Sequence, residues 1–104
     1  MMLERVCSVT DLADGEVRRF ELGELAVAVV RIGTDWYAIE DRCSHQDVAL
    51  SDGEVLTDTC EIECPKHGSC FSLRTGEVDT LPATKPVAAF GVRIDGGDVY
   101  VEVD

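Results

Sequence analysis

The chain contains only two histidines, and a cysteine stands just before each of them. The first pair lies in the segment CSH at 43–45, and the second lies in CPKH at 64–67. A thiolate and a neutral imidazole are both strong ligands for transition metals. Two such pairs, presented by two short segments, therefore predict one four-ligand metal site. The candidate ligands are Cys43, His45, Cys64 and His67.

The order of these ligands separates two kinds of metal site. Zinc sites usually pair like ligands, with two cysteines in one segment and two histidines in another. Here each segment supplies one ligand of each kind, and a single residue separates Cys43 from His45. A [2Fe–2S] cluster with two cysteines on one iron and two histidines on the other matches this mixture. We therefore favour iron–sulfur; a structural zinc module and a chance placement of core residues are the alternatives.

About half of the chain, residues 36–86, resembles the soluble Rieske ferredoxin family. The segments that carry the resemblance are WYAI at 36–39, CSHQDVALSDGEV at 43–55, IECPKHGSCFSLRTGEV at 62–78 and LPATKP at 81–86. The chain is similar to the ferredoxin components of multicomponent aromatic-ring dioxygenases. The resemblance implies one [2Fe–2S] cluster, with Cys43 and Cys64 on the inner iron and His45 and His67 on the outer iron.

Further features of the site are expected from the residues and from the resemblance. Because Gly68 follows the candidate ligand His67, backbone N–H groups there are expected to face the cluster, with an ordinary turn glycine as the alternative. The resemblance implies that the Ser69 hydroxyl donates to a sulfide, with a plain turn serine as the alternative. Phe71 stands where respiratory Rieske proteins carry a tyrosine, so one hydrogen-bond donor is lost. The two positions of the disulfide in those proteins correspond to Val48 and Lys66, so that cross-link is absent. The proline-containing segment 81–86 corresponds to the loop that covers the cluster.

Short alternating strands separated by glycine-containing turns predict an all-β fold. The expected strands are Leu3–Leu12, Glu16–Leu22, Leu25–Ile32, Trp36–Glu40, Val87–Ile94 and Asp98–Val103. Leu25–Val30 is apolar on both faces, which predicts a central strand. The family resemblance adds a Rieske fold of stacked antiparallel sheets with a small inserted cluster-binding subdomain at about 41–81. We expect one domain over residues 1–104.

Composition restricts the setting in which the protein works. The 104 residues carry a net charge of −12, with 45% hydrophobic and 29% charged residues. An acidic surface repels nucleic acid and anionic lipid, so neither is an expected partner. It suits docking against basic patches on redox proteins, although it also simply favours solubility. No long apolar run or signal-peptide pattern is present, so we expect the protein in the cytoplasm. We also expect it to be a monomer.

The three remaining cysteines are Cys7, Cys60 and Cys70. Thiols generally stay reduced in the cytoplasm. Cys7 lies in an apolar strand pattern and is expected in the core. Cys70 follows the second ligand segment and is expected near the cluster. The sequence assigns no role to Cys60.

The leading functional hypothesis is a one-electron carrier that takes electrons from a reductase and passes them to a terminal oxygenase. No nucleophile–base pair stands apart from the metal ligands, so we expect an electron-transfer component and not an enzyme. A Rieske protein of iron–sulfur assembly or of another redox pathway, and a redox sensor, are the alternatives.

Overall fold

The computed structural model describes residues 2–43, 48–66, 68–79 and 85–103, and these form three antiparallel sheets. The first sheet has the order β1-β10-β9, the second β2-β3-β4-β8 and the third β5-β6-β7. The elements are β1 (Met2–Ser8), β2 (Val17–Leu22), β3 (Leu25–Ile32), β4 (Asp35–Glu40), the 3₁₀ turn η1 (Leu50–Asp52), β5 (Glu54–Leu56), β6 (Glu61–Glu63), β7 (Cys70–Ser72), β8 (Ala89–Phe90), β9 (Val92–Asp95) and β10 (Asp98–Val103). The predicted all-β fold of stacked antiparallel sheets is confirmed.

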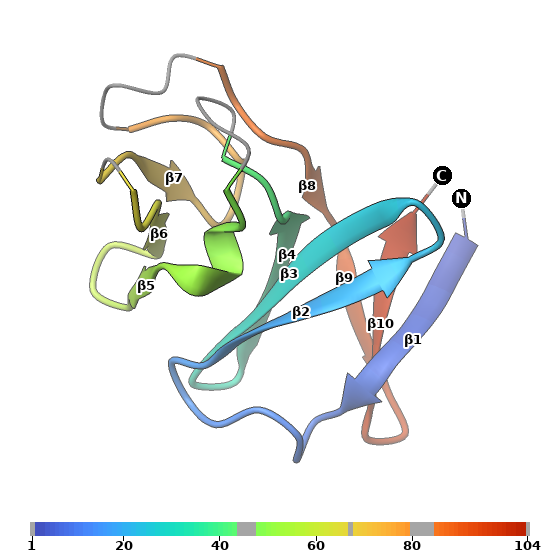
Figure 1. The fold of residues 1–104 in the computed structure, drawn as a ribbon. Coiled ribbons are helices and arrows are strands. Elements are labelled where there is room, and N and C mark those ends of the chain that lie inside the picture. Colours follow the sequence, from blue (N-terminus) through green and yellow to red (C-terminus); the bar gives the residue numbers. More distant parts are fainter. Residues whose placement is uncertain (1, 44–47, 67, 80–84, 104) are drawn as a thin grey trace.

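The second sheet lies between the other two, which explains why its central strand is apolar on both faces. Strand β3 pairs with β2 on one side and β4 on the other. Val27 and Val29 face a core shared with Val101 of β10. Ala28 and Val30 face the opposite core, which they share with the third sheet. Residues 27–30 are fully buried, as expected for a strand covered on both faces. Figure 1 shows this order of sheets across the molecule.

The third sheet and η1 form the inserted subdomain, which we expected from the sequence to bind the cluster. They occupy the chain between β4 and β8, the two neighbouring strands of the second sheet. In Figure 1 they gather on one side of the molecule, away from β1 and β10. Their inward side chains, among them Leu50, Ile62 and Leu73, pack against Ala28 and Ile39 of the scaffold. The subdomain is therefore attached to the scaffold through a common apolar core.

Two predicted strands differ from the observed ones by more than one residue at an end. The range Val87–Ile94 is wrong as a single strand, because it divides at Gly91 into β8 and β9, which belong to different sheets. A Cβ atom at Gly91 would overlap the Glu102 side chain, so glycine lets the chain pass close to β10. The strand expected at Leu3–Leu12 ends at Ser8, where Asp11 N–H donates to the Ser8 carbonyl and begins a turn. Strands β3 and β10 have the predicted bounds.

Candidate metal centre

Cys43 is buried at the start of the first ligand loop. It lies three residues after the end of β4 and is 1% exposed. Its backbone N–H donates to the Val48 carbonyl at 2.8 Å. This bond closes a loop over residues 43–48, and His45 falls within that loop by sequence. His45 itself lies outside the described residues.

Cys64 occupies the corresponding place in the second loop. It follows β6 directly, is 1% exposed and donates its backbone N–H to the Ser69 carbonyl at 2.7 Å. The loop over residues 64–69 therefore connects the paired strands β6 and β7, whose last register pair is Glu63 with Cys70. His67 falls within this loop and also lies outside the described residues.

The two loops are closed in the same way and share one core. In each, the cysteine N–H bonds to the carbonyl five residues later, which leaves room for a histidine inside the loop. Both thiols belong to the buried cluster that contains Ile62 and Phe71. Two buried sulfur ligands beneath two loops that each contain an imidazole form a suitable donor set for a mixed-ligand cluster.

Gly68 has a backbone conformation that explains the choice of glycine. Its φ is +75°, in the left-handed region that side chains disfavour. Its N–H donates to the Cys64 carbonyl at 3.1 Å. The described partner of this N–H is thus the carbonyl of Cys64, at the start of the same loop.

Ser69 and Phe71 lie beneath the second loop. Ser69 is fully buried, and its hydroxyl is hydrogen bonded, as a buried hydroxyl requires. Phe71 is fully buried, pairs with Ile62 across β6 and β7, and belongs to the same core as the two candidate cysteine ligands. A hydroxyl on this ring would therefore stand in the core beneath the loops.

The other three cysteines are also buried thiols, and none of the five cysteines forms a disulfide. Cys7 lies in the core between Leu12 and Val99, as predicted, where burial raises its pKa. Cys70 follows the second loop directly, and its thiol donates to the Gly68 carbonyl at 3.7 Å. Cys60 has a left-handed φ of 58°. Its thiol hydrogen bonds to the phenol of Tyr37, which, together with burial, raises the pKa of the tyrosine.

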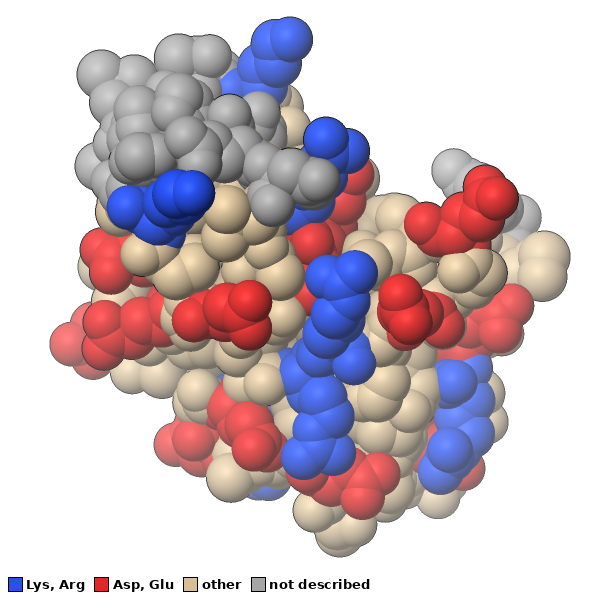
Figure 2. Space-filling view, in the orientation of Figure 1, with Lys and Arg blue, Asp and Glu red and all other residues tan. Residues whose placement is uncertain are grey.

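Positive side chains border the ligand loops of this acidic protein. Arg42, Lys66 and Lys85 are exposed, and each stands within a residue or two of a segment outside the described residues. Figure 2 shows Lys and Arg side chains beside the grey region and also in a stripe farther down this face, with Asp and Glu scattered among the other residues. Exposed positive side chains therefore border the candidate centre.

Asp41 is a buried site residue that the sequence analysis missed. Its carboxylate accepts hydrogen bonds from Arg19 of β2 and from Ser51 of η1. The available signal was a lone acid directly after an apolar strand and two residues before a candidate ligand. Neither partner is near Asp41 in sequence, so the pattern alone gave no reason to select it.

Comparison with known proteins identifies the family. The sequence model of the Rieske [2Fe-2S] domain matches residues 3–91. The chain belongs to the Rieske [2Fe–2S] domain family. The resemblance seen in residues 36–86 is thereby confirmed, and the choice between iron–sulfur and zinc is decided. This Rieske protein binds one [2Fe–2S] cluster.

Relatives of this Rieske protein are ferredoxins of dioxygenase systems. It is 41% identical over 104 residues to the ferredoxin component of biphenyl 2,3-dioxygenase from Rhodococcus jostii (strain RHA1), covering 100% of the chain and 95% of the relative. It is 38% identical over 97 residues to the 3-phenylpropionate/cinnamic acid dioxygenase ferredoxin subunit of Escherichia coli (strain K12), covering 93% and 90%. The Rieske protein is therefore an electron-transfer component of ferredoxin type and not itself an enzyme.

Solved structures agree with this assignment. The ferredoxin of carbazole 1,9a-dioxygenase from Nocardioides aromaticivorans IC177 superposes with a TM-score of 0.94 at 37% identity, covering 97% of each chain. A second match, with a TM-score of 0.88 and 38% identity, covers 95% of this chain and 100% of a chain in a complex of reduced oxygenase and oxidized ferredoxin in carbazole 1,9a-dioxygenase. Within the described residues, no helix is long and apolar enough to cross a membrane.

Proposed function

We propose that this Rieske protein carries single electrons from a reductase to the terminal oxygenase of an aromatic-ring dioxygenase system. The observation that carries the proposal is the pair of equal loops that begin at the buried thiols of Cys43 and Cys64. The complex of an oxygenase with a ferredoxin that shares this fold at 38% identity supports the acceptor. When bound, the cluster supplies a one-electron redox couple.

The proposed ligands are divided by position in the loops. Cys43 and Cys64 bind the inner iron, because their thiols are buried in the shared core. His45 and His67 would bind the outer iron. Each falls, by sequence, inside a loop that begins at one of the two cysteine ligands, so one ligand of each kind comes from each loop. Thiolates lower the reduction potential and neutral imidazoles raise it, so this set gives a potential above that of all-cysteine clusters.

The protein's own contribution is to hold the ligands and to exclude water from the sulfur side. The loop-closing hydrogen bonds at Cys43 and Cys64 fix the starting point of each loop. Phe71 and Ile62 fill the core beneath the loops, so water does not reach the thiols from that side. Exclusion of water from the sulfur side would favour electron exit through the side of the cluster that faces away from this core.

We further propose that the chain is one Rieske domain over residues 1–104 and acts as a cytoplasmic monomer. Its contacts with the reductase and the oxygenase are transient. The net charge of −12 supports encounter with basic patches on these partners and gives no support for nucleic acid or membrane binding.

The proposal is tested with anaerobically purified protein and its partners. We expect iron and acid-labile sulfide in equal amounts, and a mixed-valence EPR signal after one-electron reduction. The reduced protein should then be reoxidised, in stopped-flow mixing, by the oxygenase component of a biphenyl-type dioxygenase. A protein that holds the reducible cluster yet reduces no such oxygenase would instead support another redox pathway. Bound zinc without sulfide would contradict the ligand assignment.

A further inference from the structure

Asp41 carries a fully buried carboxylate whose oxygens are both occupied. Its side chain is 0% exposed. Oδ1 accepts the backbone N–H of Ser51 at 2.7 Å, and Oδ2 accepts the Ser51 hydroxyl at 2.6 Å. Oδ2 also accepts Arg19 Nη1 at 3.1 Å. A buried charge is stable only when it is paired and hydrogen bonded, and all three contacts meet that requirement.

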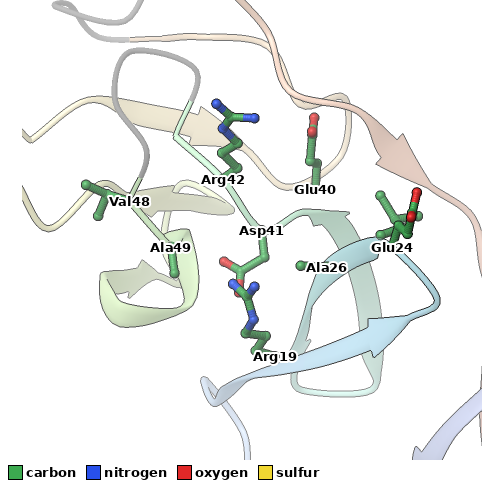
Figure 3. A pocket seen from close by; sticks show the side chains of 9 residues that line it. Arg19, Glu24, Ala26, Glu40, Asp41, Arg42, Val48 and Ala49 are labelled. Atoms are coloured by element: carbon green, nitrogen blue, oxygen red, sulfur yellow. The ribbon is translucent and has the colours of Figure 1, made fainter.

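These contacts join the scaffold to the cluster-binding subdomain. Arg19 belongs to β2, Asp41 follows β4, and Ser51 belongs to η1. Arg19 and Asp41 line a groove of about 370 Å³ between scaffold and subdomain, which is also lined by Val48, at the end of the first ligand loop, and by Ala49. Figure 3 shows Asp41 and Arg19 pointing toward each other in this groove.

The two ligand loops differ in what supports them. The second loop connects β6 and β7, which pair from Glu61–Ser72 to Glu63–Cys70 directly below it. The first loop lies between the end of β4 and η1, and no strand pairing joins these two elements. The Cys43 N–H donates to the Val48 carbonyl at the base of the first loop. Farther from the loop, Ser51 donates two hydrogen bonds to the Asp41 carboxylate, and these join the segments on either side of the loop.

We propose that Asp41 is the positioning residue of the first ligand loop, in place of the strand ladder that supports the second. Its carboxylate fixes the distance between residues 41 and 51, and Arg19 fixes the carboxylate to the scaffold. Cys43, which lies between these two positions in the chain, is thereby held in the shared core. The inference rests on the proposed ligand assignment for its effect on the cluster.

Three substitutions remove the hydrogen bonds of the Asp41 carboxylate to different extents. Ser51→Ala removes one donor and keeps the backbone N–H. Asp41→Asn keeps an acceptor for that N–H, while Arg19 loses its charged acceptor. Asp41→Ala removes all three bonds. Asp52→Asn is the matched control, because it removes one carboxylate charge at an exposed position of η1, the 3₁₀ turn that carries Ser51.

The first readout is hydrogen exchange of the cluster-loaded protein, followed by mass spectrometry of peptides. We expect exchange in 42–50 to rise about threefold in Ser51→Ala and about tenfold in Asp41→Ala, as the loss of one or more hydrogen bonds predicts. Exchange in 61–72 should change by less than about twofold, because β6 and β7 remain paired. Asp52→Asn should match the wild type in both peptides.

The second readout is pulsed EPR of the reduced cluster, which detects a nitrogen coupling from each histidine ligand. One coupling should shift in Asp41→Asn and Ser51→Ala while the other stays unchanged, since only the first loop moves. A general loss of stability would not select one histidine. The Asp52→Asn control shows how much of any change comes from charge alone.

Equal acceleration of exchange in both peptides, or none, would overturn the proposal, as would unchanged couplings in every variant. If Asp41→Ala does not fold, Asp41→Asn and Ser51→Ala decide the question. Failure of the proposed function appears separately, as a cluster-loaded wild-type protein that transfers no electron to the oxygenase. The comparison of exchange between the two loops stands in either case.

Discussion

The Cα of Gly53 lies directly against the backbone carbonyl of Glu63, so that a Cβ at residue 53 would overlap the Glu63 oxygen. This contact joins the end of η1 to the last residue of β6, one position before Cys64. Gly53 has an ordinary φ of −90°, so glycine is needed here for space and not for conformation. The subdomain thus brings the flanks of its two ligand loops together through a backbone contact.

Gly53→Ala should therefore destabilise the protein by about 2 kcal/mol, because neither backbone can move without disturbing β5 and β6. The measurement is urea unfolding of the cluster-loaded protein. Gly23→Ala is the comparison: its φ is +68°, but nothing lies within 4 Å of the added methyl group. That change should cost about 1 kcal/mol from strain alone and leave cluster content intact. Equal stability of Gly53→Ala and wild type would refute the close-contact argument.

The five buried cysteines should respond unequally to replacement by serine. Cys43→Ser and Cys64→Ser should lose most of the cluster, since a hard oxygen ligand replaces poorly the thiolate that the iron prefers. Cys7→Ser is the matched control, because Cys7 is equally buried but lies in the core next to Val99. Iron per chain after anaerobic purification measures the difference. Full iron content in either ligand variant would contradict the assignment.

Ser69 offers a test of hydrogen bonding to the cluster. If its buried hydroxyl donates to a sulfide, Ser69→Ala should lower the reduction potential, because the reduced cluster is the better acceptor. A loss of about 1.4 kcal/mol corresponds to about 59 mV for one electron. Phe71→Tyr should raise the potential where its new hydroxyl reaches a cysteine sulfur, and Phe71→Leu controls for the altered core. Protein-film voltammetry would show an unmoved potential if these donors do not face the cluster.

The sequence predicted the parts of the fold that depend on local pattern. Strand β10 was found within its bounds because Val99 and Val101 alternate with polar residues and a Gly–Gly turn precedes them. Strand β3 was found because an apolar run between two glycine turns fits a covered strand. The break at Gly91 was not predicted, since β8 and β9 pair with strands of different sheets, and this pairing exists only in the assembled fold.

The site divides in the same way. Its candidate ligands follow from spacing within two short segments, which local sequence records directly. The hydrogen bonds of the Asp41 carboxylate depend on Arg19 and Ser51, which approach it only after β2, β4 and η1 have assembled. The left-handed conformation of Cys60 and its bond to Tyr37 likewise require the tertiary fold. Contacts between distant segments leave no periodic signal in a single sequence.

Glu61 and Asp79 form a carboxyl pair beside β6, and their hydrogen bond raises the pKa of Glu61. A carboxyl whose pKa is raised in the folded state contributes stability at pH values below its unfolded pKa of about 4.3. That contribution disappears as pH rises through the folded-state pKa. Asp79→Asn should therefore stabilise the protein near neutral pH and lose this advantage under acid conditions. Urea midpoints at both pH values measure the effect.

Asp58→Asn is the control for that pair, because it removes the same charge from an exposed position on the turn between β5 and β6. Its unfolding midpoint should change little, and the change should depend less on pH. An advantage of Asp79→Asn that stays constant from acid to neutral pH would mean that the two carboxyl groups do not share a proton.

The reduction potential should depend on pH only in the alkaline range. His45 and His67 are the only histidines, and as iron ligands each keeps one ring N–H. Oxidised iron withdraws charge from the imidazoles and makes these N–H groups more acidic. The reduced state holds its protons more tightly, so by linkage the potential falls as pH rises through the oxidised-state pKa values. Voltammetry across that range measures the slope.

His45→Cys, which replaces one titrating ligand by a thiolate, should lower the potential and reduce the alkaline slope. A potential independent of alkaline pH in the wild type would count against histidine ligation.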